Sequence, residues 1–304
     1  MQFQIKATYT LGWKGRFFIS ILMLMKEKIV KRAEVLGFCM GVRAAMNKVE
    51  RAADSAGQHD TVSTYGPLIH NAQAIKKLAA KGVGQVNTPD EVDGGTVVIR
   101  AHGVPQEIYG KLKDHGAAIV DGTCPRVLRS MRVVERYCKQ GCHVILVGDA
   151  DHGEVQAVAS YSDDVTVVEN RVQASQIDVP DESLVIAQTT VSQREYDAVC
   201  EVLLKKNENI TIVQSICPAT QERQTALKKL ALEVEAILVI GGKHSSNTKR
   251  LYDMAVETGR PAWHIESCEE VPDEVFGFDS IGITAGASTP DWVIDEVEKK
   301  LKEQ

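Results

Sequence analysis

The sequence predicts an α/β protein built from three pseudo-symmetric α/β domains, each with a mostly parallel sheet. Three cysteines, Cys39, Cys124 and Cys217, each follow an apolar, strand-like run and a short turn, and a helical pattern comes directly after each of them. Strands that alternate with helices of about ten to fifteen residues indicate βαβ units, in which the strands run parallel. The repeated order of strand, turn, cysteine and helix therefore predicts three similar units around a pseudo-threefold axis.

The spacing after each cysteine supports this repeat. Gly148 lies 24 residues after Cys124, and Gly241 lies 24 residues after Cys217. In the first unit, 27 residues lead from the cysteine to Gly66. Each of these glycines ends an apolar, strand-like run, so the three units agree in length as well as in pattern.

The elements follow in the same order in each unit: a strand to the cysteine, a helix, a strand to the glycine, a second helix, and a final strand. The strands that lead to the cysteines are predicted at residues 29–36, 117–121 and 210–214. The first helices are predicted at 44–56, 127–139 and 220–233, the strands to the glycines at 62–65, 144–147 and 237–240, and the final strands at 97–99, 184–187 and 281–284.

The unit boundaries follow from these elements. We place the first unit at residues 25–123, including the strand that leads to Cys39, the second at 124–216, and the third, with a C-terminal helix, at 217–304. Residues 1–24 are expected to be an N-terminal extension with no role in the fold. The apolar run at 17–25 is too short to span a bilayer, and no small-residue cleavage site follows it.

The composition is that of a soluble globular protein. The chain has 304 residues, of which 44% are hydrophobic and 25% charged, and its formal net charge is -6. The absence of a dominant block of Lys and Arg argues against a nucleic-acid or membrane partner. Seven cysteines, an odd number spread along the chain, do not resemble a secreted disulfide framework. We therefore expect a cytoplasmic protein.

The three repeated cysteines are candidate metal ligands. Each precedes a helix, whose N-terminal amides and dipole favour a thiolate. Three thiolates that converge without a fourth protein ligand would leave one metal position open for chemistry. The other cysteines are expected to be ordinary small buried side chains; these are Cys138, Cys142, Cys200 and Cys268.

Polar residues follow the strands at the carboxyl edge, where parallel sheets bind ligands. They are His70, His152 and Ser245, four positions after the glycines, and His102, Thr189 and Ser288, after the final strands. His70 and His102, together with Ser245, Ser246, Asn247 and Ser288, would make a donor-rich pocket suited to an anion such as a diphosphate. The alternative for Ser245 or Ser246 is the capping of a helix that begins near Thr248.

An imidazole and a carboxylate, His152 and Glu154, lie two positions apart on one loop and form a possible proton-delivery pair. Thr189 and Thr190 would either relay a proton through a hydroxyl or only end a strand. These readings depend on the three-unit framework, which brings the strand ends together.

Nine short motifs occur in one order along the chain. They are GFCMGV at Cys39, GPLIHN at His70, AHGV at His102, TCP at Cys124, His152-x-Glu154, QTTVS at Thr189, ICPAT at Cys217, SSN at 245–247 and GAST at Ser288. From about Lys28 to the C-terminus, the chain closely resembles the 4-hydroxy-3-methylbut-2-enyl diphosphate reductase family of the non-mevalonate isoprenoid pathway.

The resemblance implies three α/β domains around one 4Fe-4S cluster per chain, held by Cys39, Cys124 and Cys217 with one open iron. It implies reductive dehydroxylation of the allylic diphosphate to isopentenyl and dimethylallyl diphosphate, with electrons from a low-potential donor such as ferredoxin or flavodoxin. It also implies that Glu154 delivers the proton and that His152 and Thr189 lie near the substrate hydroxyl. The diphosphate ligands would be His70, His102, Ser245, Ser246, Asn247 and Ser288.

One position departs from the family pattern, because Gly153 stands where proline is usual between the histidine and the glutamate. Two other functions remain open from the residues alone. A hydro-lyase would use the cluster only as a Lewis acid and would need no reductant. A non-catalytic metal-binding or redox-sensing protein would hold zinc on the same thiols, and its preparation would be colourless rather than brown.

Overall fold

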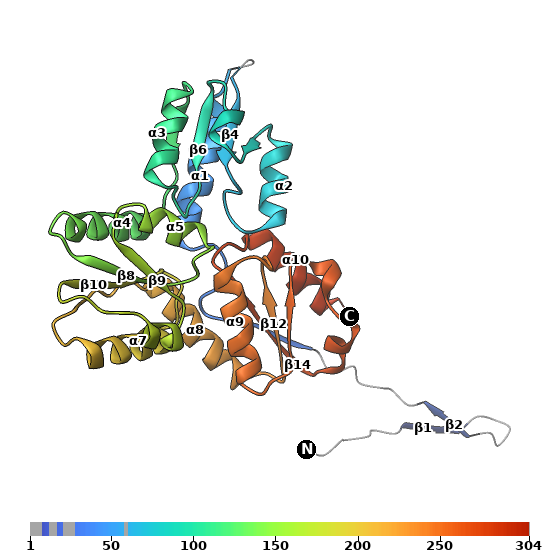
Figure 1. Ribbon diagram of the computed structural model, residues 1–304. Coiled ribbons are helices and arrows are strands. Elements are labelled where there is room, and N and C mark those ends of the chain that lie inside the picture. The colour runs from blue at the N-terminus through green and yellow to red at the C-terminus, as the bar shows by residue number, and fades with distance from the viewer. Residues whose placement is uncertain (1–7, 12–16, 21–27, 58–59, 304) are drawn as a thin grey trace.

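The computed structural model describes residues 8–11, 17–20, 28–57 and 60–303. Within this part of the chain, three four-stranded sheets all have parallel pairing. Figure 1 shows three α/β units grouped around a common centre, with helices on both faces of each sheet. This confirms the predicted fold class. No helix of the described residues is long and apolar enough to cross a membrane.

The three sheets have the same strand order. The first is β5 (Gly84–Val86), β4 (Val62–Tyr65), β6 (Thr96–Ile99) and β7 (Ala118–Asp121). The second is β9 (Val165–Val168), β8 (His143–Val147), β10 (Ser183–Ala187) and β11 (Thr211–Ile212). The third is β13 (Ala262–Ile265), β12 (Ala236–Ile240), β14 (Ser280–Ala285) and β3 (Ile29–Arg32).

The helices fall into matching sets. Those between β3 and β7 are α1 (Met40–Ser55), α2 (Ala72–Ala80) and α3 (Gln106–Asp114), with a short 3₁₀ turn at Pro89–Glu91. Those between β7 and β11 are α4 (Pro125–Cys138), α5 (Gly153–Ala159), α6 (Arg171–Gln176) and α7 (Gln193–Lys206). The last set is α8 (Pro218–Ala231), α9 (Ser246–Glu257) and α10 (Asp291–Lys302), with 3₁₀ turns at Cys268–Glu270 and Asp273–Gly277.

The strand that leads to Cys39 does not pair where the sequence analysis placed it. We counted it with the first unit, but β3 pairs with β14 in the third sheet, with Val30 opposite Ile281. In each sheet the fourth strand leads to the cysteine of the following unit, so β3 completes the third sheet although it precedes every other strand of the three parallel sheets in the chain. β3 therefore closes the ring of three units.

The sequence analysis also missed one strand in each unit. β5, β9 and β13 each lie between the strand to the glycine and the final strand, and each forms the outer edge of its sheet. β5 has only three residues, two of them exposed, so the apolar run that marks a buried strand is absent there. β9 and β13 have four residues each, VTVV and AWHI, and only one buried residue each. The sequence analysis predicted only a helix between the strand to the glycine and the final strand, whereas the structure has an additional edge strand in this connection.

The alternation of side chains along a strand builds a core on each face of a sheet. In the second sheet, Val144 and Leu146 pack against α4 and α5, whereas Ile145 and Val147 pack against α6 and α7. All five residues of β10 and of β12 are buried. Both faces of these sheets are covered, and in parallel sheets of this kind ligands bind at the carboxyl ends of the strands.

The N-terminal segment is described at β1 (Thr8–Leu11) and β2 (Phe17–Ser20) only. These strands pair antiparallel with each other and join none of the three parallel sheets of the described chain. The rest of residues 1–24, which we expect to have no role in the fold, lies outside the described residues.

Candidate active site

The carboxyl ends of the three sheets surround one cavity of about 100 Å³. All twelve residues singled out from the sequence line it: Cys39, His70, His102, Cys124, His152, Glu154, Thr189, Cys217, Ser245, Ser246, Asn247 and Ser288. The cavity thus receives side chains from all three units. The structure brings the twelve together, while their individual roles remain predictions.

The three cysteines occupy equivalent positions, because each is the N-cap residue of a helix: α1, α4 or α8. Cys39 Sγ accepts a hydrogen bond from the amide of Val42 at 3.4 Å. Burial raises the pKa of the Cys124 thiol, and the neighbouring Cys39 and Cys217 raise it further. Three thiols close enough to affect one another's charge form a donor set that suits a soft metal or an iron–sulfur cluster.

A glycine allows the thiols to approach. A Cβ atom added to Gly41 in α1 would overlap Cys124 Sγ, which comes from the next unit. Position 41 is therefore restricted to glycine by the cysteine of a neighbouring unit rather than by its own backbone. All seven cysteines are free, so no disulfide competes for these thiols.

Arg223 is a cavity residue that the sequence analysis missed. Its side chain is 3% exposed and lines the cavity beside the cysteines. Nη2 donates to the carbonyl of Gly37 at 2.6 Å, and Nη1 donates to the carbonyl of Ala219 at 2.9 Å. A buried guanidinium requires compensation, which thiolates at Cys39 and Cys217 can supply. Nothing in the sequence marked this arginine, because arginines on helices are usually exposed.

Glu154 is buried, at 2% exposure, in the first turn of α5. Its two carboxyl oxygens accept hydrogen bonds from Thr189, one from the amide at 2.6 Å and one from the hydroxyl at 2.8 Å. Burial raises the pKa of Glu154, although both hydrogen bonds and the charge of Arg250 act in the opposite direction. The carboxyl group is therefore held in one orientation and retains its proton to a higher pH than an exposed glutamate.

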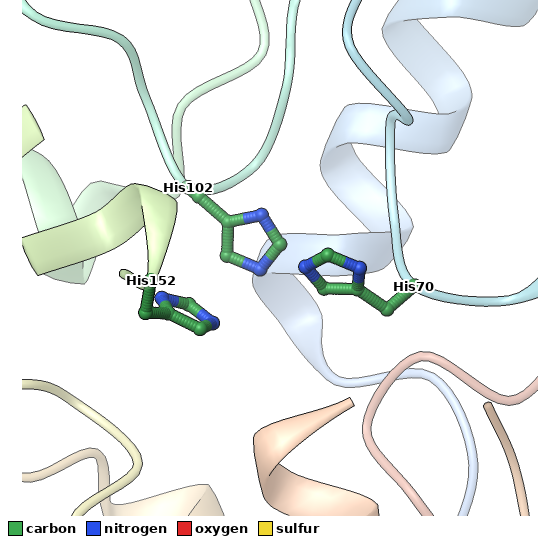
Figure 2. A group of neighbouring side chains, drawn as sticks. All are labelled: His70, His102 and His152. Atoms are coloured by element: carbon green, nitrogen blue, oxygen red, sulfur yellow. The ribbon is translucent and has the colours of Figure 1, made fainter. Parts of the chain in front are cut away.

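Three histidines form one wall of the cavity (Figure 2). The ring centroids of His70 and His102 are 4.9 Å apart, those of His102 and His152 are 5.0 Å apart, and those of His70 and His152 are 6.0 Å apart. Burial lowers the pKa of all three: that of His70 below its usual value, that of His102 well below it, and that of His152 to about 4. All three rings are therefore neutral at pH 7.

A hydrogen bond fixes the tautomer of the His152 ring. His152 is the N-cap of α5, and its Nδ1 lies 3.1 Å from the amide of Glu154, which donates to it. The proton of the neutral ring must then reside on Nε2, which is free to donate. One nitrogen from each ring lies within 4.8 Å of the others, so the cluster offers convergent donors for an anion or convergent lone pairs for a metal ion.

The N-terminus of α9 also lines the cavity. Ser245 is its N-cap and accepts from the amide of Thr248 at 3.4 Å, as the capping alternative predicts. The side-chain nitrogen of Asn247 is buried and has no hydrogen-bond partner among the described residues. Ser288 Oγ donates to the carbonyl of His70 at 3.3 Å. An unpaired amide beside a helix N-terminus is suited to an anionic ligand.

Thr190, which the sequence analysis paired with Thr189 as a possible proton relay, also lines the cavity, and its Oγ1 is buried without a partner in the described chain. Other cavity residues escaped the sequence analysis as candidates. Arg126 and Thr220 lie two and three positions after cysteines at helix starts, and both reach the cavity. The position after the cysteine was the only available signal, and it does not distinguish a ligand contact from a helix residue that faces solvent.

Comparison with known proteins agrees with this geometry. The model of the LytB protein family matches residues 30–302. The chain is 44% identical to the 4-hydroxy-3-methylbut-2-enyl diphosphate reductase of Treponema denticola, over 90% of this chain and 99% of that protein. It is 42% identical to the enzyme of the same name from Anaeromyxobacter sp. (strain Fw109-5), over 90% of this chain and 96% of that one.

Two solved structures are similar to the whole arrangement. The E-1-hydroxy-2-methyl-but-2-enyl-4-diphosphate reductase from Plasmodium falciparum superposes with a TM-score of 0.83 at 27% identity, covering 90% of this chain and 86% of that chain. A structure of (E)-4-hydroxy-3-methyl-but-2-enyl diphosphate reductase, described as the terminal enzyme of the non-mevalonate pathway, gives a TM-score of 0.67 at 34% identity. It covers 91% of this chain and 100% of that chain.

Proposed function

Because the chain belongs to the LytB protein family, we propose that it reduces (E)-4-hydroxy-3-methylbut-2-enyl diphosphate to isopentenyl diphosphate and dimethylallyl diphosphate. Two electrons and two protons enter, the allylic C–O bond breaks, one C–H bond forms and water leaves. The observation that carries this proposal is the single cavity in which three thiols, a buried carboxyl group and an anion-binding wall meet.

The three thiols are the proposed ligands of a 4Fe-4S cluster, one per chain. Bound to Cys39, Cys124 and Cys217, it would supply the electrons and an open iron position that acts as a Lewis acid. The fit rests on the shared cavity, on the helix N-termini that favour thiolates, and on the glycine at position 41 that leaves space for Cys124 Sγ.

The diphosphate would bind to the wall opposite the thiols. His70 and His102 can each donate one hydrogen bond as neutral rings, and Ser245, Ser246, Asn247 and Ser288 add donors at the start of α9 and after β14. Each such bond to a charged oxygen contributes roughly 1.5–3 kcal/mol. Several are required, because removing a diphosphate from water is costly.

Glu154 is the proposed proton donor to the departing hydroxyl group. When protonated, Glu154 donates to Thr189 Oγ1, which lies 2.8 Å away and whose own hydrogen can then point into the cavity. Thr189 and His152, which also line this part of the cavity, would orient the substrate hydroxyl. The residues of the chain thus position the substrate, exclude water and move the proton.

Turnover after anaerobic purification tests the proposal. We expect a brown, oxygen-sensitive protein that converts the hydroxylated diphosphate only when a low-potential reductant is supplied. Turnover without reductant would instead indicate a hydro-lyase, and a colourless zinc protein without turnover would indicate a binding or sensing function. We also propose a low-potential donor such as ferredoxin or flavodoxin as partner, and the cytoplasm as location.

A further inference from the structure

Arg100 lies immediately after β6, at the same sheet edge as the residues of the cavity. It lines a second hollow of about 470 Å³, and the three histidines line both this hollow and the cavity. We call this hollow the outer basin. Its other lining cations are Lys249 and Arg250, and its lining carboxylates are Asp149, Asp151 and Asp253.

The guanidinium group of Arg100 is held between two glycines of different units. A Cβ atom added to Gly66 would lie 3.0 Å from Nη1, and one added to Gly153 would lie 2.5 Å from Nη2 and 2.9 Å from Cζ. Nε donates to the carbonyl of Gly103 at 3.3 Å, so the side chain is also fixed near its middle. A side chain at either glycine would require the guanidinium group to move, by more at Gly153 than at Gly66.

The backbone does not explain glycine at position 153. Gly153 is the first residue of α5, and it is not among the glycines with positive φ in the described chain. Alanine would therefore suit this backbone conformation, and proline is favoured at the first position of a helix. A side chain at this position would have to displace the guanidinium group, so Gly153 and Arg100 are sterically matched.

Arg100 is a permanent cation that has no carboxylate partner among the residues that the structure describes. It is half-buried and forms no ion pair within the described residues, and the group that most favours its charge is the Tyr65 phenol. The charge of Arg250, by contrast, faces Glu154, Asp149 and Asp253. Arg100 also contributes, after burial, to lowering the pKa of all three histidines. A lasting positive charge beside neutral imidazoles disfavours a metal ion and favours an anion.

We propose that Arg100 is a positioning residue of the diphosphate site, supplying fixed positive charge behind His70, His102 and His152, and that Gly153 is the residue that admits it. The ligand follows from the proposed function: the three imidazoles donate the hydrogen bonds, and Arg100 provides charge that neutral imidazoles lack. The reaction then needs no protonation of the histidines to hold a diphosphate.

Titration of the anaerobically prepared full-length protein with inorganic diphosphate tests the charge. Arg100→Gln should weaken affinity roughly tenfold, whereas Arg100→Lys should restore most of it because it keeps the charge. Lys249→Gln removes an exposed cation from the same basin and should change affinity less than about twofold at physiological salt. In turnover, Arg100→Gln should raise KM with little change in kcat, which a general loss of structure would not do.

A double-mutant cycle tests the pairing with Gly153. Gly153→Ala should weaken diphosphate affinity by a factor similar to that of Arg100→Gln, because the added Cβ displaces the guanidinium group. In the Arg100→Gln background the same alanine should add little, since glutamine ends near the position of Arg Nε. Thermal melting identifies any variant that does not fold. Arg100→Lys, which keeps the charge, and Gly153→Ala, which displaces it, then test the same charge in two independent ways.

An Arg100→Gln affinity within twofold of wild type, or an equal effect of Gly153→Ala in both backgrounds, would overturn this inference. If wild type turns over the substrate and Arg100→Gln is unaffected, the inference falls and the proposed function stands. If wild type binds diphosphate without turnover, the proposed function falls and the titration still decides the role of Arg100. If wild type does not bind diphosphate, both the inference on Arg100 and the proposed function are contradicted.

Discussion

Glu154 has the burial and the contacts that a proton donor needs. Replacing it by glutamine keeps the shape and the hydrogen bond from the Thr189 amide, but removes the transferable proton. We expect turnover to fall by about 10²-fold or more, with unchanged iron content. The wild-type rate should also decline as pH rises through the raised pKa of Glu154, because the deprotonated form cannot donate. Near wild-type turnover in Glu154→Gln would show that protons arrive by another route.

The cysteines divide into two groups that mutation can separate. Cys124→Ser removes a thiol of the cavity, and we expect it to lose most iron and activity. Cys200→Ser is the control: Cys200 is buried in the core around α7, away from the cavity, whereas Cys124 is half-buried and lines the cavity. Iron analysis of the anaerobic proteins decides the matter, and normal iron content in Cys124→Ser would exclude the cluster assignment.

At the scale of elements, the helix starts determine the site. Each cysteine lies between a short loop and the start of α1, α4 or α8. The strand, loop and helix signals in the sequence were therefore enough to locate the three thiols. The contacts between units are different: Gly41 against Cys124, and Arg223 against Gly37, join positions far apart in sequence. No local pattern encodes such pairs, which is why the sequence analysis did not find them.

The contact at Gly41 gives a prediction for α1. Gly41→Ala places a Cβ against Cys124 Sγ, and overpacking of this kind costs about 1–3 kcal/mol. We expect a lower melting temperature and reduced iron content. Gly110→Ala in α3 is the control, because an added Cβ there meets nothing within 4 Å. That change should stabilise the protein by about 0.5–1 kcal/mol. Equal iron content in the two variants would contradict the proposed restriction.

At the scale of the whole molecule, the equal spacings predicted three units and one shared edge, and the structure has both. All twelve candidate residues could be placed at that edge because strand ends are local features. Two aspects were beyond the sequence. Pairing of parallel strands depends on distant segments, so the sheet that β3 joins was not visible. Buried arginines such as Arg100 and Arg223 are exceptions to the usual exposure of charged residues, and only the packing reveals them.

The placement of β3 leads to a test of the ring. In the first unit, α3 is followed by β7, the fourth strand of the same sheet. In the third unit, α10 comes near the end of the chain, and the equivalent strand is β3 at its beginning. Arg32 of β3 already forms an ion pair with Asp295 of α10 at 2.7 Å. Moving the β3 segment behind α10 should therefore restore the connection order that the first unit has.

We predict that a circular permutant that starts at Phe38 and carries residues 28–37 after Gln304, through a short flexible linker, will fold. Its free energy of unfolding should be within about 2 kcal/mol of the parent, because loop closure costs grow slowly with length. Deleting residues 28–37 without replacing them is the control. That change removes the fourth strand of the third sheet, and domains stable by only about 5–15 kcal/mol do not tolerate such a loss. Denaturant unfolding of the two variants decides between them, since a permutant that fails like the deletion would mean that β3 is fixed by its own connection to α1 rather than by the third sheet.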